Sequence, residues 1–103
     1  MNVIEKYRDV DKIINKDLVL IIAKTHTCSA CNTIMRTLET NVSYFDEVEN
    51  YTIFVDDIDQ FRGEYLIFSV PTVLIFSKGK ELLRESRYMN YAKMDRLIEM
   101  FTK

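Results

Sequence analysis

The apolar residues of this chain change their spacing several times, and each change predicts a different element. Residues 18–23 form a continuous apolar run, which is typical of a strand buried on both faces of a sheet. Residues 51–55 indicate a second strand, and residues 72–76, directly after the single proline, indicate a third. A turn at 77–80 and a return strand at 81–88 predict an antiparallel hairpin.

Around these strands the apolar spacing is helical. It predicts a helix from Cys31 to about Asn41 and a short helix within residues 60–68. Asn90 can cap a last helix, whose apolar residues should share one face: Tyr91, Met94, Leu97, Ile98 and Phe101. The N-terminal pattern fits either one helix up to about Asn15 or an edge strand at residues 2–6 followed by a helix from Asp9.

This order of elements predicts an α/β fold. Strands that alternate with helices and end in a hairpin and a helix indicate a central mixed sheet of four to five strands, with helices on both faces. The chain has 103 residues with two glycines and one proline, so no Gly/Ser/Pro-rich linker divides it. We therefore expect a single domain over residues 1–103.

Composition and charge exclude several functions. A net charge of −2 gives no basic face for nucleic acid, so we expect no nucleic-acid partner. The longest apolar stretch is about six residues, far below the roughly 20 that span a bilayer, so we expect no membrane partner. The first residues lack a basic segment followed by a long apolar one, which favours a cytoplasmic location over secretion.

The two cysteines, Cys28 and Cys31, are the strongest chemical signal. They stand between a predicted strand and a predicted helix. Backbone N–H groups at a helix N-terminus favour a thiolate, with a pKa lowered from about 8.5 toward 7. A disulfide across so short a loop stabilises little, and zinc usually wants four nitrogen or sulfur ligands where this segment adds only His26. We therefore predict thiol–disulfide exchange and no metal.

His26 lies two residues before Cys28. As a cation it would lower the pKa of the thiol, and as a neutral base it would accept a proton. We predict that it tunes the reaction, although an ordinary surface histidine also fits the position.

Four features, taken in order, resemble the thioredoxin family. They are the strand–C-x-x-C–helix unit from Leu18 to Leu38, the strand ending Val55-Asp56, the segment Ser69-Val70-Pro71-Thr72, and the hairpin Phe76–Glu81 before a C-terminal helix. The resemblance implies a thioredoxin-like fold and a protein disulfide oxidoreductase that needs no cofactor beyond its redox-active disulfide. It also implies disulfide-containing proteins and a thiol or reductase electron donor as partners. We expect a monomer.

The resemblance also implies roles for individual residues. Cys28 would be the exposed nucleophile and Cys31 the more buried resolving thiol. Pro71 would be cis, and the backbone of Val70 would pair with the substrate chain. Thr27, in place of the usual tryptophan, would contact substrate. Between the cysteines stand Ser29 and Ala30, which would tune the reduction potential.

Besides Thr27 and the Ser29-Ala30 pair, which stands where the family usually has Gly-Pro, four positions depart from the family pattern. Ile22 replaces a buried acid near the second cysteine, Thr52 falls near the lysine that accompanies this acid, Arg36 replaces a helix-kinking proline, and Arg87 falls near a usual glycine. Without the acid, Cys31 lacks a proton acceptor, which should slow the resolving step. A non-catalytic thioredoxin-like adaptor or redox sensor therefore stays open as an alternative. A glutaredoxin-like enzyme is less favoured, because residues 85–90 contain no glycine.

Overall fold

A computed structural model of the protein describes residues 1–102. Within these residues the strands are β1 (Asn2–Ile4), β2 (Val19–Lys24), β3 (Glu49–Phe54), β4 (Thr72–Ser77) and β5 (Lys80–Ser86). The α-helices are α1 (Val10–Ile14), α2 (Ser29–Asn41), α3 (Asp59–Glu64) and α4 (Tyr91–Thr102), and short 3₁₀ turns lie at Tyr7–Asp9 and Phe45–Glu47. None of these helices is long and apolar enough to cross a membrane.

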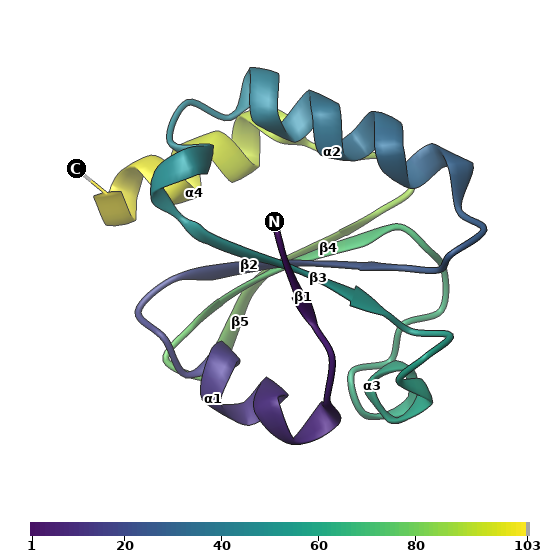
Figure 1. Cartoon of the computed structure of the whole chain (residues 1–103). Coiled ribbons are helices and arrows are strands. Elements are labelled where there is room, and N and C mark those ends of the chain that lie inside the picture. Colours follow the sequence, from purple (N-terminus) through teal and green to yellow (C-terminus); the bar gives the residue numbers. More distant parts are fainter. Residues whose placement is uncertain (103) are drawn as a thin grey trace.

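The five strands form one mixed sheet in the order β1-β3-β2-β4-β5. β3 runs parallel to both β1 and β2, whereas β4 runs antiparallel to β2 and to β5. Helices α2 and α4 cover one face of the sheet, and α1 and α3 lie on the other (Figure 1). The α/β fold with a mixed sheet and helices on both faces is confirmed, and the sheet has five strands.

The central strand β2 shows why the apolar run is continuous. Its residues contribute alternately to two cores, one under α1 and α3 and one under α2 and α4. Val19, Ile21 and Ala23 belong to the first core, while Leu20 and Ile22 belong to the second. All five are fully buried, because β2 is covered on both faces.

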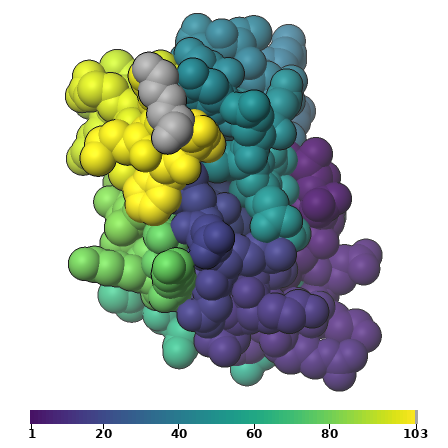
Figure 2. Space-filling model, turned by 90° about the vertical axis from the view of Figure 1, so that its left-hand side faces the viewer, coloured from purple at the N-terminus to yellow at the C-terminus, as the bar shows by residue number. Residues whose placement is uncertain are grey.

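The register of the sheet gives its two ends different roles. Val19 pairs with Phe76, so the β4–β5 turn lies at the amino end of β2. There the N–H groups of Lys78 and Gly79 donate to the carbonyls of Lys16 and Ile14, each at 2.8 Å. Figure 2 shows this turn (green) against the segment before β2 (dark blue). The other end of β2, where Ala23 pairs with Thr72, leads to the cysteines.

Gly79 is favoured at this turn by its backbone conformation. Its φ of +85° lies in the left-handed region, where a residue with a Cβ is strained, whereas the side-chain oxygen of Asn15, 2.8 Å from the place of a Cβ, belongs to an exposed side chain that can move. The turn expected at residues 77–80 is therefore present, with glycine at the position that needs it.

The structure settles the alternative left open at the N-terminus and confirms the cap of the last helix. At the N-terminus the alternative with an edge strand is the correct one, and α1 begins at Val10. Asn90 caps α4 as predicted, since its Oδ1 accepts from the N–H of Lys93 at 3.0 Å. Of the apolar residues expected on one face of α4, Met94 and Ile98 are fully buried, whereas Phe101 in the last turn is 47% exposed.

Candidate functional site

The two cysteines lie at the start of α2, as the sequence predicts. Cys28 is the N-cap residue, with extended backbone (φ −82°, ψ 96°), and its N–H donates to the carbonyl of Thr25 at 3.3 Å. The N–H of Cys31 donates to the carbonyl of Cys28, also at 3.3 Å. The two side chains form a disulfide, with Cα atoms 5.5 Å apart. We call residues 25–31 the cysteine segment.

The two sulfur-bearing residues differ in exposure. Cys31 is 1% exposed, whereas Cys28 is partly exposed. Around Cys28 the residues Thr27, Ser29 and Ala30 are all exposed. An external sulfur can therefore approach Cys28 and not Cys31. Ala30 has no core-packing role that would explain its presence between the cysteines.

A second segment meets the cysteine segment at this end of the sheet. The pairing of Thr72 with Ala23 places residues 65–71, which precede β4, beside the turn from β2 to α2. We call residues 65–71 the proline loop. The Val70–Pro71 peptide bond is cis, the isomer that the resemblance implied. Pro71 is buried, and Val70 is partly exposed and packs against the core under α1 and α3.

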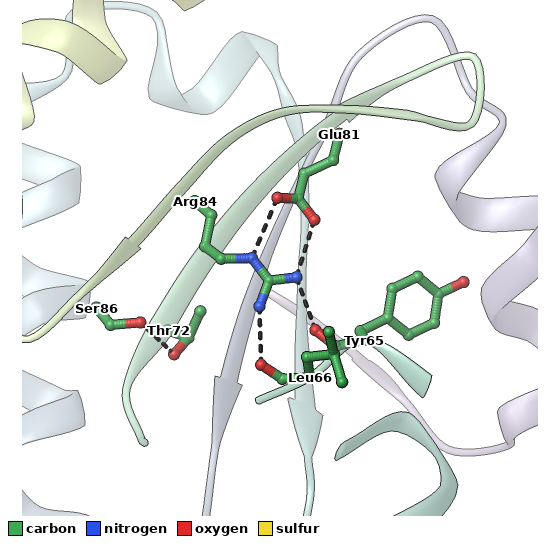
Figure 3. Close-up of polar contacts among 6 residues, drawn as sticks. All are labelled: Tyr65, Leu66, Thr72, Glu81, Arg84 and Ser86. Atoms are coloured by element: carbon green, nitrogen blue, oxygen red, sulfur yellow. Dashed lines mark hydrogen bonds and ion pairs between the residues drawn. The ribbon is translucent and has the colours of Figure 1, made fainter. Parts of the chain in front are cut away.

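Arg84 of β5 holds the beginning of the proline loop (Figure 3). Its Nη2 donates to the carbonyl of Tyr65 at 2.7 Å, and its Nη1 donates to the carbonyl of Leu66 at 3.0 Å. Glu81 orients the guanidinium through contacts of 2.9 and 3.1 Å. Leu66 has a φ of +54°, in the left-handed region, so Arg84 fixes a chain reversal that a non-glycine residue adopts at a cost.

Thr72 holds the other end of the proline loop. Its hydroxyl donates to the carbonyl of Ser69 at 2.7 Å and lies 2.8 Å from the hydroxyl of Ser86 on β5 (Figure 3). Thr72 itself is 1% exposed, whereas its partner Ser86 is exposed, so these bonds are partly buried. Two side-chain anchors to β5 therefore determine where Val70 and Pro71 lie.

Similar proteins identify the fold. No protein-family model matches the chain. The chain is 26% identical over 72 residues to the thioredoxin-like protein YdfQ of Bacillus subtilis, a match that spans 70% of this chain and 64% of that protein. The structure of Fasciola hepatica thioredoxin is 27% identical, with a TM-score of 0.79 over 99% of this chain and all of that one. The chain has the thioredoxin fold.

A Malassezia sympodialis thioredoxin agrees, with 23% identity and a TM-score of 0.81 over the whole of this chain and 91% of its own. The chain is thus thioredoxin-like in fold and in its C-x-x-C disulfide, which confirms the resemblance seen in the sequence.

His26 is directed to an acidic partner. Its Nε2 lies 2.8 Å from Oδ2 of Asp57, its ring stacks on Phe54 at 3.9 Å, and its backbone N–H donates to Asp56. The hydrogen bond to Asp57 raises the pKa of His26 above 6.5, with smaller coulombic contributions from Asp57 and Asp56. Desolvation and the charge of Lys24 oppose this rise. The carboxylate of Asp57 balances the imidazolium charge, so the influence of His26 on Cys28 is reduced.

The same cluster is the candidate cation site among residues 1–102. One ligand atom each from His26, Asp56 and Asp57 lies within 4.8 Å of the others. All three residues are exposed, and His26 and Asp57 already satisfy each other. We assign no metal to this cluster.

The departures from the thioredoxin pattern have structural counterparts. Ile22 is fully buried and shares a core with Leu38 of α2, so an apolar side chain fills the position of the family's acid. Arg87 has a φ of +64°, a backbone conformation that favours glycine. The backbone at this position therefore has the left-handed conformation that suits the family's glycine, although the residue in this chain is arginine.

Sequence reasoning missed Arg84 and its partner Glu81. The two residues are three apart on β5, and the carbonyls that Arg84 binds belong to residues 18 and 19 positions earlier. Backbone carbonyls carry no residue-type signal, so the sequence offered no pattern that pairs β5 with the proline loop.

Proposed function

We propose that this chain is a thiol–disulfide oxidoreductase that reduces the disulfides of proteins. The observation that carries the proposal is the asymmetry of the Cys28–Cys31 disulfide, with one half accessible and one half buried at a helix N-terminus. The N–H groups of that terminus favour a thiolate on the accessible sulfur once the pair is reduced. We also propose that it works as a monomer in the cytoplasm, where thiols are kept reduced.

The proposed reaction consists of two successive thiol–disulfide exchanges. The Cys28 thiolate attacks one sulfur of the substrate disulfide, whose S–S bond breaks and releases one substrate thiolate. The thiol of Cys31 then loses its proton to water and attacks Cys28 Sγ, which releases the second thiolate and leaves the Cys28–Cys31 disulfide. A dithiol or a reductase supplies the two electrons that restore the reduced pair.

The proposed roles divide the site between chemistry and recognition. Cys28 and Cys31 react, Val70 and Thr27 contact the substrate chain, and Pro71 shapes the loop that presents Val70. Ser29 and Ala30 tune the pair from between the cysteines, and His26 contributes a weak, pH-dependent charge.

Substitution of each cysteine tests this proposal. Cys31→Ser should accumulate mixed disulfides with a disulfide-containing peptide, because the resolving thiol is gone, whereas Cys28→Ser should form none. Mass spectrometry of the adducts and an insulin-reduction assay with dithiothreitol measure both effects. A trapped adduct in Cys28→Ser but not in Cys31→Ser would show that the roles are reversed.

The buried Ile22 favours a second candidate, an adaptor or redox sensor with a slow dithiol. An apolar residue there leaves Cys31 without a side-chain proton acceptor from β2. Insulin reduction by the wild-type chain that does not exceed the dithiothreitol background would favour the adaptor.

A further inference from the structure

A pocket of about 190 Å³ lies where the proline loop meets α3 and the cysteine segment. It is lined by Thr25, Arg62, Ile67, Phe68, Ser69 and Val70. Val70 is the residue whose backbone we propose to pair with the substrate chain. A side chain of a peptide bound along Val70 can therefore reach this pocket without leaving the site.

The charge of this pocket is unusual for the molecule. Arg62 is the one charged residue in its lining. Of three other surface pockets of the described chain, one is lined by three acidic residues and no basic one, and two combine acidic with basic side chains. The chain as a whole carries a net charge of −2. The pocket that reaches Thr25 of the cysteine segment thus differs in having one cation and no acid in its lining.

Arg62 is available to a ligand. It is exposed on α3, and within residues 1–102 its side chain has no hydrogen bond or ion pair. Its backbone carbonyl accepts from the N–H of Ile67 at 2.9 Å, which ties α3 to the proline loop. A guanidinium is planar, and two of its unused N–H donors can bind both oxygens of a carboxylate at once.

The pocket also offers apolar surface. Phe68 is 89% exposed and lines the pocket with Arg62, while its neighbour in the loop, Ile67, is buried. An apolar ring next to a cation suits a side chain with methylene groups and a terminal carboxylate. Because Arg84 and Thr72 already hold the loop, binding orders little additional backbone.

We propose that this pocket binds an acidic side chain, preferentially glutamate, that lies close to the disulfide-bonded cysteine of the protein substrate. The proposal rests on the proposed function, because it deepens the substrate preference of that same site. It makes Arg62 a specificity-determining residue and Phe68 its apolar neighbour.

A set of matched peptide disulfides tests the preference. Each set of four peptides differs at a single position, which carries glutamate, glutamine, lysine or phenylalanine. One set is made for each of the two positions before the cysteine and each of the two positions after it. At low salt the wild-type chain should reduce the best-placed glutamate peptide with a kcat/KM about threefold above its glutamine counterpart, which is the strength of an exposed ion pair. Added salt should diminish this ratio.

Substitutions assign the preference to Arg62. Arg62→Gln should bring the glutamate-to-glutamine ratio to about one, and Arg62→Glu should favour the lysine peptide. The matched control is Arg96→Gln, which removes an exposed arginine from α4 on the other face of the sheet and should keep the wild-type ratio.

Three outcomes would overturn the proposal. The wild-type chain could reduce the glutamate and glutamine peptides equally at every position, or the preference could survive in Arg62→Gln. A preference for the phenylalanine peptide that Arg62 substitutions leave unchanged would assign the pocket to an apolar side chain instead. Reduction of none of the peptides, with insulin also unreduced, would reject the proposed function together with the pocket.

Discussion

The cysteine segment and the proline loop meet at one end of the sheet, yet different kinds of contacts hold them. In the cysteine segment the backbone bonds of Cys28 and Cys31 reach only three residues back, and the disulfide spans the same interval, while the long-range bonds of this segment, to Asp56 and Asp57, come from His26. The proline loop is held by Arg84 and Thr72, whose partners lie up to 19 residues away. The reactive group is therefore encoded locally, whereas the surface beside it depends on β5.

This difference indicates that recognition and sulfur chemistry can be separated by mutation. A change on β5 should alter how a peptide docks while a small thiol still reaches Cys28. A change in the cysteine segment should affect small and large substrates alike.

Replacing Arg84 should loosen the proline loop. Arg84→Met removes two hydrogen bonds from a charged donor, and because the side chain is partly exposed we expect a loss of about 1–2 kcal/mol in the free energy of unfolding. The KM for a peptide disulfide should rise severalfold, while the rate at which dithiothreitol reduces the Cys28–Cys31 disulfide stays unchanged. Denaturant titration and steady-state kinetics measure these effects.

Two further variants control this experiment. Arg84→Lys keeps the charge but cannot span both carbonyls, so its effect should be intermediate. Lys16→Met removes an ion pair with Glu49 at the opposite end of the sheet, which should change stability little, because water screens the pair, and leave KM unchanged. If Arg84→Met lowers stability without changing the KM for peptides, Arg84 supports the fold and does not position the loop.

The residues that local patterns describe were well predicted from the sequence. The apolar run at 18–23 indicated a strand buried on both faces, and Gly79 marked the hairpin turn, because an unbroken apolar run and a turn glycine can both be seen in the sequence itself. The C-x-x-C between strand and helix likewise placed both cysteines at a helix start. The spacing of apolar residues, the residue types of turns and the residues at helix ends are all visible in a single sequence.

What the sequence could not predict depends on pairs of distant elements. Arg84 looked like one more charge on a hairpin, since its partners are backbone carbonyls that become neighbours only when β5 pairs with β4. His26 was expected to act on Cys28, but the fold brings Asp57 to it from 31 residues away. Phe101 fits the helical period of Met94 and Ile98, yet it is 47% exposed, and the period alone carries no signal of which turns are covered.

Arg87 provides a smaller test on the β5 side of the comparison. It follows Ser86, which contacts Thr72, and its φ of +64° is unfavourable for a residue with a Cβ. Arg87→Gly should raise the free energy of unfolding by about 0.5–1 kcal/mol by removing that penalty. Arg87→Ala keeps the Cβ and should give no such gain. An equal gain in both variants would show that the arginine side chain, and not the backbone, is unfavourable.

The smallest effect should come from His26 in the cysteine segment. Its pKa is raised chiefly by the hydrogen bond to Asp57, so Asp57→Asn should return the imidazole pKa toward 6.5, as measured by NMR titration. Asp56→Asn should shift it less, because Asp56 contacts the backbone N–H of His26 and contributes only a small coulombic effect.

The sign of the pH dependence follows from the direction of this shift. Because the folded pKa of His26 is raised, the His26–Asp57 pair contributes its full stability below the unfolded pKa of about 6.5 and loses it as the pH rises through the folded value. Denaturant titrations should therefore show that wild type exceeds Asp57→Asn in free energy of unfolding by more at pH 5.5 than at pH 8. A difference that is larger at pH 8 would mean that Asp57 acts on another group. If the reduction of the Cys28–Cys31 disulfide by dithiothreitol follows the same pH range in the wild type but not in Asp57→Asn, the charge of His26 reaches the thiols, and the cysteine segment is tuned from the turn after β3 as the proline loop is from β5.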